Sequence, residues 1–371
     1  MRRALIIGGG PAGAAAAIRI ASAGRPVTLI ERNEGPTDKV CGDFLSGEAV
    51  QSLGALGVDV AAVGPEPIGG LRLLHGRHCA TTHLPFAAFG ISRRVLDEAL
   101  LRRAADCGAS VLRGHAVRRL SHGRRGYVAD TTLGPMATDD LFLATGKHEL
   151  RGMARPQSGS GLLGLKMYYA FDPTQSRELR GHVELTLFTH GYAGLLAVRP
   201  DQAVLCVLIS RSGYRAMGSR WAALLEALGG SCPELGRRLN GARPLLARPL
   251  AISGLPYGYL ARGNGTLPVF RVGDQAMVVG SLTGDGVAQA LASGTLAAEV
   301  WLRGETAGEY QGTLRTLAAR QMRLASAMHR LCLLGPLQSS IVRLCRTWPA
   351  LARAAAVATR VNHLTHDGYA G

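Results

Sequence analysis

The feature that most constrains the fold is a glycine-rich turn close to the start of the chain. Residues 4–7 predict a short buried strand, and residues 11–22 predict an alanine-rich helix. Between them lies a turn of the pattern G-x-G-x-x-G, whose glycines allow a tight bend, close approach of a pyrophosphate and close packing of helix on strand. The phosphates would then lie at the positive end of the helix dipole. The contacts expected from this turn are Gly8, Gly10, Pro11, Ala12 and Gly13.

An acidic residue follows the turn at the distance that a ribose contact requires. A second apolar strand is predicted at residues 27–30, and Glu31 closes it. In dinucleotide-binding βαβ units, an acid about 20 residues after the turn binds a ribose hydroxyl. Strand, turn, helix and acid together predict a dinucleotide-binding domain, and Arg32 is expected to contact the same ligand.

A second glycine motif far downstream indicates which dinucleotide is bound. The stretch R-V-G-D at residues 271–274 leads through T-G-D-G at 283–286 into another alanine-rich helix. One long cofactor that is held at both ends explains two such motifs, and FAD is a cofactor of that kind. We therefore expect FAD, with contacts at this end from Gly273, Asp274, Gly284, Gly286 and Val287.

Composition places the chain among globular α/β proteins of the cell interior. Its 371 residues suffice for a large core, and no apolar run reaches the ~20 residues needed to cross a bilayer. The seven cysteines are scattered singly and odd in number, so neither a disulfide framework nor a zinc site is expected. These features predict a cytoplasmic protein with no metal site.

The formal net charge of +16 comes almost entirely from arginine, since the lysines are only Lys39, Lys147 and Lys166. No aromatic residues interleave with basic ones, and no helix-turn-helix, zinc-finger or RNP pattern occurs, so nucleic-acid binding is not expected. Residues 311–365 carry eight arginines and no acid, which favours peripheral contact with an anionic membrane. Within that tail, one predicted helix face is expected to pack in the core. Its members are Leu314, Leu317, Gln321, Leu324, Met328 and Leu331.

The order of predicted elements indicates an α/β fold with two interleaved parts. Residues 161–210 predict successive strands with no helix between them, which is typical of an antiparallel sheet. We therefore predict a Rossmann-like FAD-binding domain of the glutathione reductase type at 1–67, 90–155 and 265–305. An antiparallel substrate domain is predicted at 68–89 and 156–264, and a basic helical C-terminal region at 306–371.

Together these segments resemble the flavoprotein superfamily of the aromatic-ring hydroxylases, such as p-hydroxybenzoate hydroxylase, and the geranylgeranyl reductases. The resemblance covers roughly residues 1–305 and rests on both glycine motifs, the Cys41-Gly42-Asp43 loop, and Arg93 with Asp97. It implies that Arg93 reaches the FAD pyrophosphate and that Asp274 binds ribityl or ribose hydroxyls. Further cofactor contacts are expected at Cys41, Gly42, Val117 and Gly146.

The chain departs from the family patterns at two places that concern the electron donor and the flavin edge. Thr145 stands where the hydroxylases carry an acid linked to FAD and NADPH, and Ser281 stands where most relatives carry proline. The reductant is therefore left open between NAD(P)H and a flavin- or ferredoxin-type donor. The tryptophan-rich signature of flavin halogenases is missing, so halogenation is not expected.

Candidate catalytic residues are Cys41, Asp43, Lys166 and Tyr192. Cys41 could donate a proton or modulate the reactivity of the flavin. Asp43 could act as a base on a phenol or orient the loop, and Lys166 could touch substrate. Tyr192-Ala193-Gly194 resembles the tyrosine–glycine turn of the reductase substrate pocket, which makes Tyr192 a second candidate proton donor.

The leading hypothesis is monooxygenation of a lipophilic phenolic, quinol or polyketide-type substrate through a flavin C4a-hydroperoxide. The alternative is a geranylgeranyl reductase-type flavoenzyme that reduces C=C bonds of an isoprenoid chain. A third hypothesis is a flavoprotein that modifies a residue of a partner protein during maturation of a quinone cofactor.

Overall fold

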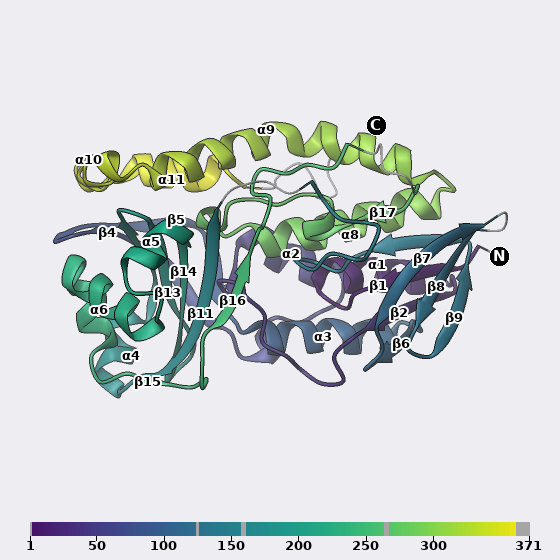
Figure 1. The fold of residues 1–371 in the computed structure, drawn as a ribbon, viewed down its shortest axis with the longest axis horizontal. Coiled ribbons are helices and arrows are strands. Elements are labelled where there is room, and N and C mark those ends of the chain that lie inside the picture. Colours follow the sequence, from purple (N-terminus) through teal and green to yellow (C-terminus); the bar gives the residue numbers. More distant parts are fainter. Residues whose placement is uncertain (1, 124–125, 157–160, 263–266, 361–371) are drawn as a thin grey trace.

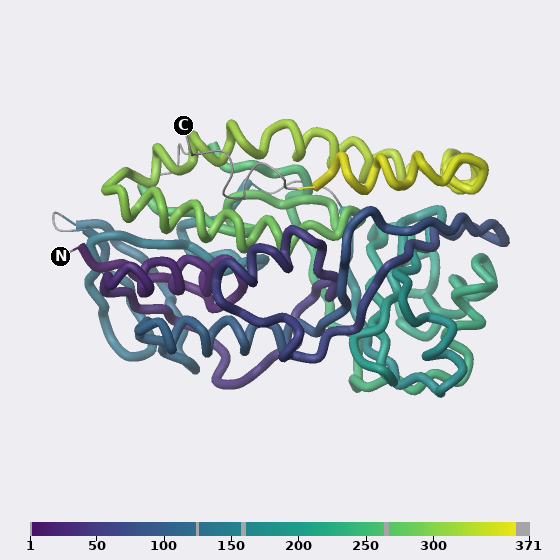
Figure 2. Tube along the Cα trace, turned by 180° about the vertical axis from the view of Figure 1, so that it is seen from behind, coloured from purple at the N-terminus to yellow at the C-terminus, as the bar shows by residue number. Residues whose placement is uncertain are grey.

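The computed structural model describes residues 2–123, 126–156, 161–262 and 267–360. Figure 1 shows a parallel sheet toward the N-terminal side of the molecule and a larger, mainly antiparallel sheet beside it. A layer of C-terminal helices lies along one side of both (Figure 2).

The parallel sheet has the order β17-β10-β1-β2-β6. Successive side chains of a strand point to opposite faces of the sheet, and both faces of this sheet are covered, so both sets of side chains are buried. Ala4 and Ile6 pack toward the helices, whereas Leu5 and Ile7 pack toward a small antiparallel sheet. The strands are β1 (Ala4–Ile7), β2 (Val27–Glu31), β6 (Ser110–Arg113), β10 (Asp140–Leu143) and β17 (Phe270–Arg271).

Helices cover one face of this sheet and a β-meander covers the other. The helices are α1 (Pro11–Ser22), α2 (Gly47–Ala55), α3 (Arg93–Asp106) and α8 (Gly286–Leu302). The meander consists of β7 (Val117–Gly123), β8 (Gly126–Thr131) and β9 (Gly134–Thr138). Helix α1 has the bounds predicted from its apolar stretch, with Pro11 in its first turn, where proline loses no hydrogen bond.

The larger sheet has the order β15-β11-β14-β13-β12-β4-β5-β3, with β16 also pairing β11. All of its strand pairs are antiparallel except β4 with β12, which is parallel. Strands β4 and β5, which follow α2 in the chain, thus join a sheet built mostly from residues beyond 160. The strands are β3 (Phe44–Leu45), β4 (Glu66–His75), β5 (His78–Gly90), β11 (Leu162–Ala170), β12 (Gly181–Phe188), β13 (Gly191–Arg199), β14 (Gln202–Ser210), β15 (Arg243–Pro244) and β16 (Leu250–Ser253).

Four short helices accompany the larger sheet: α4 (Pro173–Leu179), α5 (Arg211–Ala216), α6 (Trp221–Ser231) and α7 (Pro233–Leu239), among the described residues. The prediction that no helix interrupts 161–210 is wrong, because α4 lies between β11 and β12. Asp172 caps α4 and Gln175 returns a bond to the Asp172 backbone N–H. This D-P-x-Q capping box was the local sequence signal for a helix start.

The C-terminal layer consists of α9 (Ala307–Leu333), α10 (Gly335–Thr347) and α11 (Pro349–Ala358), and α10 and α11 pack against β5. The predicted core face of α9 is wrong in its second half, where Leu324 and Leu331 are exposed. That predicted face repeats every 3.5 residues and so drifts around a straight helix of 3.6 residues per turn. The buried face instead follows Leu314, Ala318, Met322, Ala325, His329 and Cys332.

All seven cysteines, which lie within the described residues, are free thiols. In the part of the chain that the structure describes, no helix is both long and apolar enough to span a bilayer.

Candidate active site

The first glycine turn requires glycine at two positions for steric reasons. Gly8 has a φ of 108°, and a Cβ there would lie 2.4 Å from the Ala144 carbonyl oxygen. A Cβ on Gly13 would lie 2.0 Å from the Gly8 carbonyl oxygen. Only glycine at both positions lets α1 start directly above β1, with its N-terminus at the carboxyl edge of the sheet.

Glu31 lies at the end of β2, beside this turn. Its carboxylate accepts the Gly9 N–H at 2.8 Å and the Asn33 N–H at 3.1 Å. Burial raises the pKa of Glu31, but these hydrogen bonds and the nearby Lys39 outweigh it and lower the pKa overall. An ionised acceptor is therefore fixed where the sequence predicts a ribose contact.

Arg93 faces the same turn from the start of α3. Its Nε and Nη2 bind the two Asp97 carboxylate oxygens at 2.7 and 2.8 Å. A Cβ on Gly10 would lie 3.4 Å from Arg93 Nη2, so glycine keeps open the space between the turn and the guanidinium. Burial lowers the pKa of Arg93, but Asp97 and Cys41 more than compensate and raise it. A fixed positive charge opposite a helix N-terminus suits a diphosphate.

The second motif continues this site along the carboxyl edge of the sheet. The Asp274 carbonyl accepts a bond from Arg155 Nη1 at 2.6 Å, and the Arg155 Nε binds Glu149 at 2.7 Å. Arg155 is buried. The sequence reasoning missed Arg155, since no motif surrounds it.

Helix α8 starts at Gly286, and Gly284 and Asp285 connect it to a 3-10 turn at Ser281–Thr283. Gly284 has a φ of 71°, and a Cβ there would lie 2.7 Å from the Phe44 ring. At Gly286 a Cβ would meet nothing within 4 Å, which leaves the helix N-terminus accessible. Free N–H groups at such a terminus stabilise negative charge. The turn, Arg93 and this terminus together fit a long anionic cofactor.

A cavity of about 300 Å³ lies beside the α8 N-terminus. Its walls come from the loop at 40–42, the larger sheet and the C-terminal helices, and they are mainly apolar. Examples are Leu185, Leu196, Leu208, Met328, Ile341 and Ala355. Cys41, Gly42, Asp274, Gly284 and Gly286 line the cavity too, so it adjoins the predicted cofactor site.

One polar cluster surrounds Tyr192 in the cavity wall. The cavity is also lined by Lys147, Asp274 and Arg360. The Tyr192 hydroxyl donates to Ser281 Oγ at 3.3 Å and lies 3.4 Å from His329 Nδ1. The Tyr257 ring, which also lines the cavity, lies 5.2 Å from the His329 ring. Burial raises the pKa of Tyr192 well above its usual value and lowers that of His329 to about 4. At neutral pH the tyrosine is therefore protonated and the histidine neutral. The sequence reasoning missed His329, whose only signal was its place in the helical repeat of α9.

Two of the predicted catalytic residues, Asp43 and Lys166, bind each other in the structure. Lys166 Nζ lies 2.7 Å from both Asp43 carboxylate oxygens, and Tyr168 donates to Asp43 Oδ2 at 2.5 Å. Both ionic side chains are fully buried, and neither lines the cavity. Burial lowers the pKa of Lys166, but Asp43 outweighs it and keeps the amine charged. This geometry corrects two predictions. Asp43 is not a free base and Lys166 is not placed to touch substrate, because the two form an ion pair that ties the loop at 39–46 to β11.

Residues 1–137 match the family model of the FAD binding domain. The first part of the chain is therefore an FAD-binding domain. FAD was the cofactor predicted from the two glycine motifs, and that prediction is confirmed.

The similarity of the flavoprotein to known proteins extends beyond the matched domain. Menaquinone reductase of Mycolicibacterium smegmatis is 28% identical over 321 residues, covering 81% of this chain and 76% of that protein. Menaquinone reductase of Mycobacterium tuberculosis is 29% identical over 317 residues, covering 80% and 75%.

Solved structures share the fold. The flavin-dependent brominase Bmp2 superposes with a TM-score of 0.80 at 18% identity, covering 99% of this chain and 95% of Bmp2. PqsL of Pseudomonas aeruginosa, in complex with 2-aminobenzoylacetate, gives 0.73 at 17% identity, covering 92% and 99%. These likenesses confirm the predicted α/β flavoprotein fold and nothing about substrate.

Three further residues that were predicted to contact the cofactor differ in their surroundings. The Gly146 carbonyl accepts a bond from Gln275 at 2.9 Å, so it supports the R-V-G-D motif. Arg32 is exposed and lies 2.7 Å from His148 Nε2. Val117 packs between the sheet and the β-meander. For these residues cofactor contact stays a prediction.

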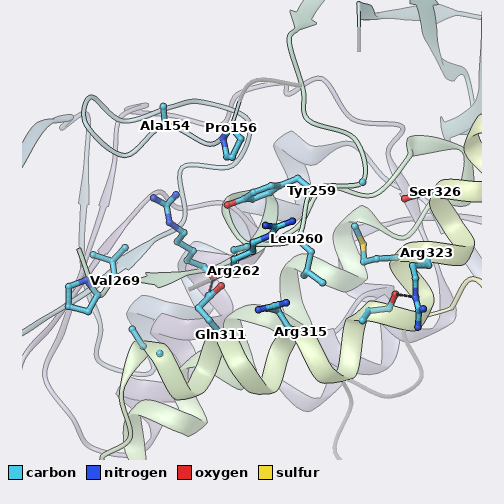
Figure 3. A pocket seen from close by; sticks show the side chains of 18 of the residues that line it. Ala154, Pro156, Tyr259, Leu260, Arg262, Val269, Gln311, Arg315, Arg323 and Ser326 are labelled. Carbon is cyan, nitrogen blue, oxygen red and sulfur yellow. Dashed lines mark hydrogen bonds between the residues drawn. The ribbon is translucent and has the colours of Figure 1, made fainter. Parts of the chain in front are cut away.

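A larger cavity of about 1110 Å³ lies along α9, next to the segment 258–262 (Figure 3). Its lining includes Tyr259, Gln311 and several arginines, among them Arg262, Arg315 and Arg323, and none of the predicted site residues. The smaller cavity, which adjoins the flavin-edge glycines, is therefore the candidate substrate site.

Proposed function

We propose that the flavoprotein reduces a C=C bond in the isoprenoid side chain of a lipophilic quinone. The observation that carries this proposal is the apolar cavity at the N-terminus of α8, whose outer wall is built by the C-terminal helices. Apolar walls favour a hydrocarbon chain, since burial of apolar area is worth about 25 cal/mol per Å². The relatives named menaquinone reductase, which cover most of this chain, support a quinone that carries such a chain.

The reduction adds two electrons and two protons across the double bond. Bound FAD supplies the electrons, taken from NAD(P)H or from a flavin- or ferredoxin-type donor. FAD would be held by the first glycine turn, Glu31, Arg93 and the α8 N-terminus, in the positions described above. The α8 N-terminus would stabilise the negative charge of the reduced cofactor.

Two side chains of the cavity could supply a proton. The Tyr192 hydroxyl is held by contacts with Ser281 and His329, and its raised pKa keeps it protonated until a proton is needed. Cys41 lies in the cavity wall next to Arg93, whose positive charge would stabilise the thiolate left after proton donation. The buried pair of Asp43 and Lys166 would position the loop that carries Cys41.

The test is anaerobic turnover of the reduced holoenzyme with menaquinones of different chain length, followed by mass spectrometry. The expected product is heavier than the substrate by two hydrogen atoms in the side chain. Tyr192→Phe and Cys41→Ser should separate the proton donors: the true donor's variant loses about 10²-fold in kcat. Tyr257→Phe is the matched control within the same cavity. No change in side-chain mass with any prenylated quinone would overturn the proposal.

Hydroxylation of a lipophilic phenol or quinol is the second candidate. It is favoured by the mainly apolar walls of the cavity, because a site that excludes water protects reactive oxygen chemistry. One of the structures that share the fold is described as a probable FAD-dependent monooxygenase, PqsL. An aerobic product heavier by one oxygen atom, absent under anaerobic conditions, would establish this reaction instead.

Modification of a partner protein has less support. It needs an opening over the flavin that admits a polypeptide, whereas α9, α10 and α11 wall the cavity. Detection of a covalent modification on a protein substrate would be needed to support this hypothesis.

A further inference from the structure

The C-terminal helices carry an unusual concentration of exposed apolar side chains. Among the described residues, large hydrophobic side chains are exposed at ten positions, and eight of them lie between Leu324 and Val357. Trp348, at the junction of α10 and α11, is 59% exposed. We call six of these residues the outer tail face: Leu331, Leu334, Leu337, Leu344, Trp348 and Leu351. Exposed apolar side chains concentrated in one segment in this way are a feature of interaction surfaces.

The charged side chains of these helices beyond residue 310 are all positive. Arg330, Arg343, Arg346 and Arg353 are exposed on the same helices, and residues 311–360 contain no acid. Apolar side chains with an aromatic anchor, flanked by arginine, are the composition of helices that lie in the interface of an anionic membrane. A protein partner could pair acidic side chains with some of these arginines. It would also need an apolar groove that fits the exposed leucines, whereas a bilayer accepts apolar side chains without such a groove.

The same helices have an opposite side that faces the substrate cavity. Met328 and Cys332 of α9, Ile341 and Cys345 of α10, and Ala352 and Ala355 of α11 line that cavity. In Figures 1 and 2 these helices form one layer along a single side of the molecule, so a flat surface could approach them without obstruction. The layer therefore stands between the exterior and the cavity.

We propose that the outer tail face lies on an anionic lipid bilayer, from which a lipophilic substrate enters the cavity between the tail helices. The apolar side chains would insert to the depth of the headgroups, and the arginines would contact lipid phosphates. Membrane binding does not depend on the proposed reaction, whereas the delivery of substrate rests on it.

The test uses the holoenzyme with vesicles of phosphatidylcholine alone or mixed with phosphatidylglycerol. Trp348 serves as an internal probe because it is exposed, whereas Trp301 is buried and Trp221 is half-buried. We expect sedimentation with the anionic vesicles, a blue shift of tryptophan fluorescence that Trp348→Phe removes, and weakening by salt. Leu344→Glu with Leu351→Glu should weaken binding at least tenfold, and Arg346→Gln with Arg353→Gln should weaken it in anionic vesicles only.

Leu133→Glu is the matched control, because Leu133 is 53% exposed on the β-meander, outside the tail. Equal loss of binding in this control, or full binding by the Leu344/Leu351 variant, would overturn the proposal. So would a fluorescence shift that appears with rising protein concentration and no lipid, since a second copy of the chain would then cover the face. If vesicles bind but prenylated quinones are not turned over, membrane binding stands and the proposed reaction fails.

Discussion

At the scale of single residues, Asp43 shows how a side chain can compensate for an unfavourable backbone. Its φ is 55°, in the left-handed region that favours glycine. Here the Asp43 carboxylate is held by Lys166 and Tyr168, which fixes the loop at the backbone conformation that glycine would adopt freely.

We predict that Lys166→Met lowers the free energy of unfolding by about 3–5 kcal/mol, because Asp43 is left as an unpaired buried charge. Asp43→Gly with Lys166→Met should lose much less than the sum of the single variants, since no charge then stays buried. Urea unfolding measures all three. Arg102→Met, which breaks an exposed pair with Glu98, is the control and should cost about 0–1 kcal/mol. Additive losses would show that the pair is not coupled.

His329 predicts a pH dependence of stability. Its pKa falls from 6.5 in the unfolded chain to about 4 in the folded protein, because burial disfavours the imidazolium. Between these values the unfolded state binds more protons, so stability decreases as the pH falls from about 6.5 to 4. The lost contribution is on the order of 3 kcal/mol. Unfolding curves of His329→Gln should lack this part of the pH dependence; a curve parallel to that of the parent protein would refute the assignment.

At the scale of elements, the junction between β1 and α1 is determined by steric contact. Gly13 lies where helix and strand approach most closely, and the sequence pattern alone identified it. Helix α9 shows the opposite case, because its apolar residues allow two stripes and only packing against α8 and the larger sheet selects the buried one.

Gly13→Val is therefore expected to displace α1 from β1 and abolish FAD binding, since its Cβ would lie 2.0 Å from the Gly8 carbonyl oxygen. Loss of the flavin absorbance after purification measures this. Gly54→Ala, at an exposed position of helix α2 where a Cβ meets nothing within 4 Å, should retain FAD and be slightly more stable. A yellow Gly13→Val protein would contradict the role given to the turn.

At the scale of the whole molecule, the C-terminal helices are fastened to the flavin-edge turn. Arg360 follows α11, donates to the Thr283 carbonyl and lies 2.9 Å from Asp285, with both ionic side chains buried. Its guanidinium also lies 4.7 Å from the centre of the Phe86 ring on β5. The end of the tail thus contacts both the start of α8 and the larger sheet.

Arg360→Met should lower the free energy of unfolding by about 3–5 kcal/mol, because Asp285 is left buried without its partner. It should also let chymotrypsin, whose cleavage sites do not include arginine, cleave the tail faster in the folded protein, which limited proteolysis resolves. Arg353→Met, at an exposed arginine of α11, is the matched control and should change neither quantity. Equal melting temperatures for the two variants would show that Arg360 does not fasten the tail.

The sequence by itself determined the features that depend on neighbouring residues or on a cofactor of known shape. The bounds of α1, the apolar strands of the parallel sheet, and the two glycine motifs follow from backbone sterics and periodicity, so these local patterns sufficed to predict FAD. Tertiary structure decided which side chains meet across long stretches of chain. It paired Asp43 with Lys166, brought Arg155 to Asp274 and placed His329 beside Tyr192, because burial and charge neutralisation depend on neighbours that no local pattern specifies.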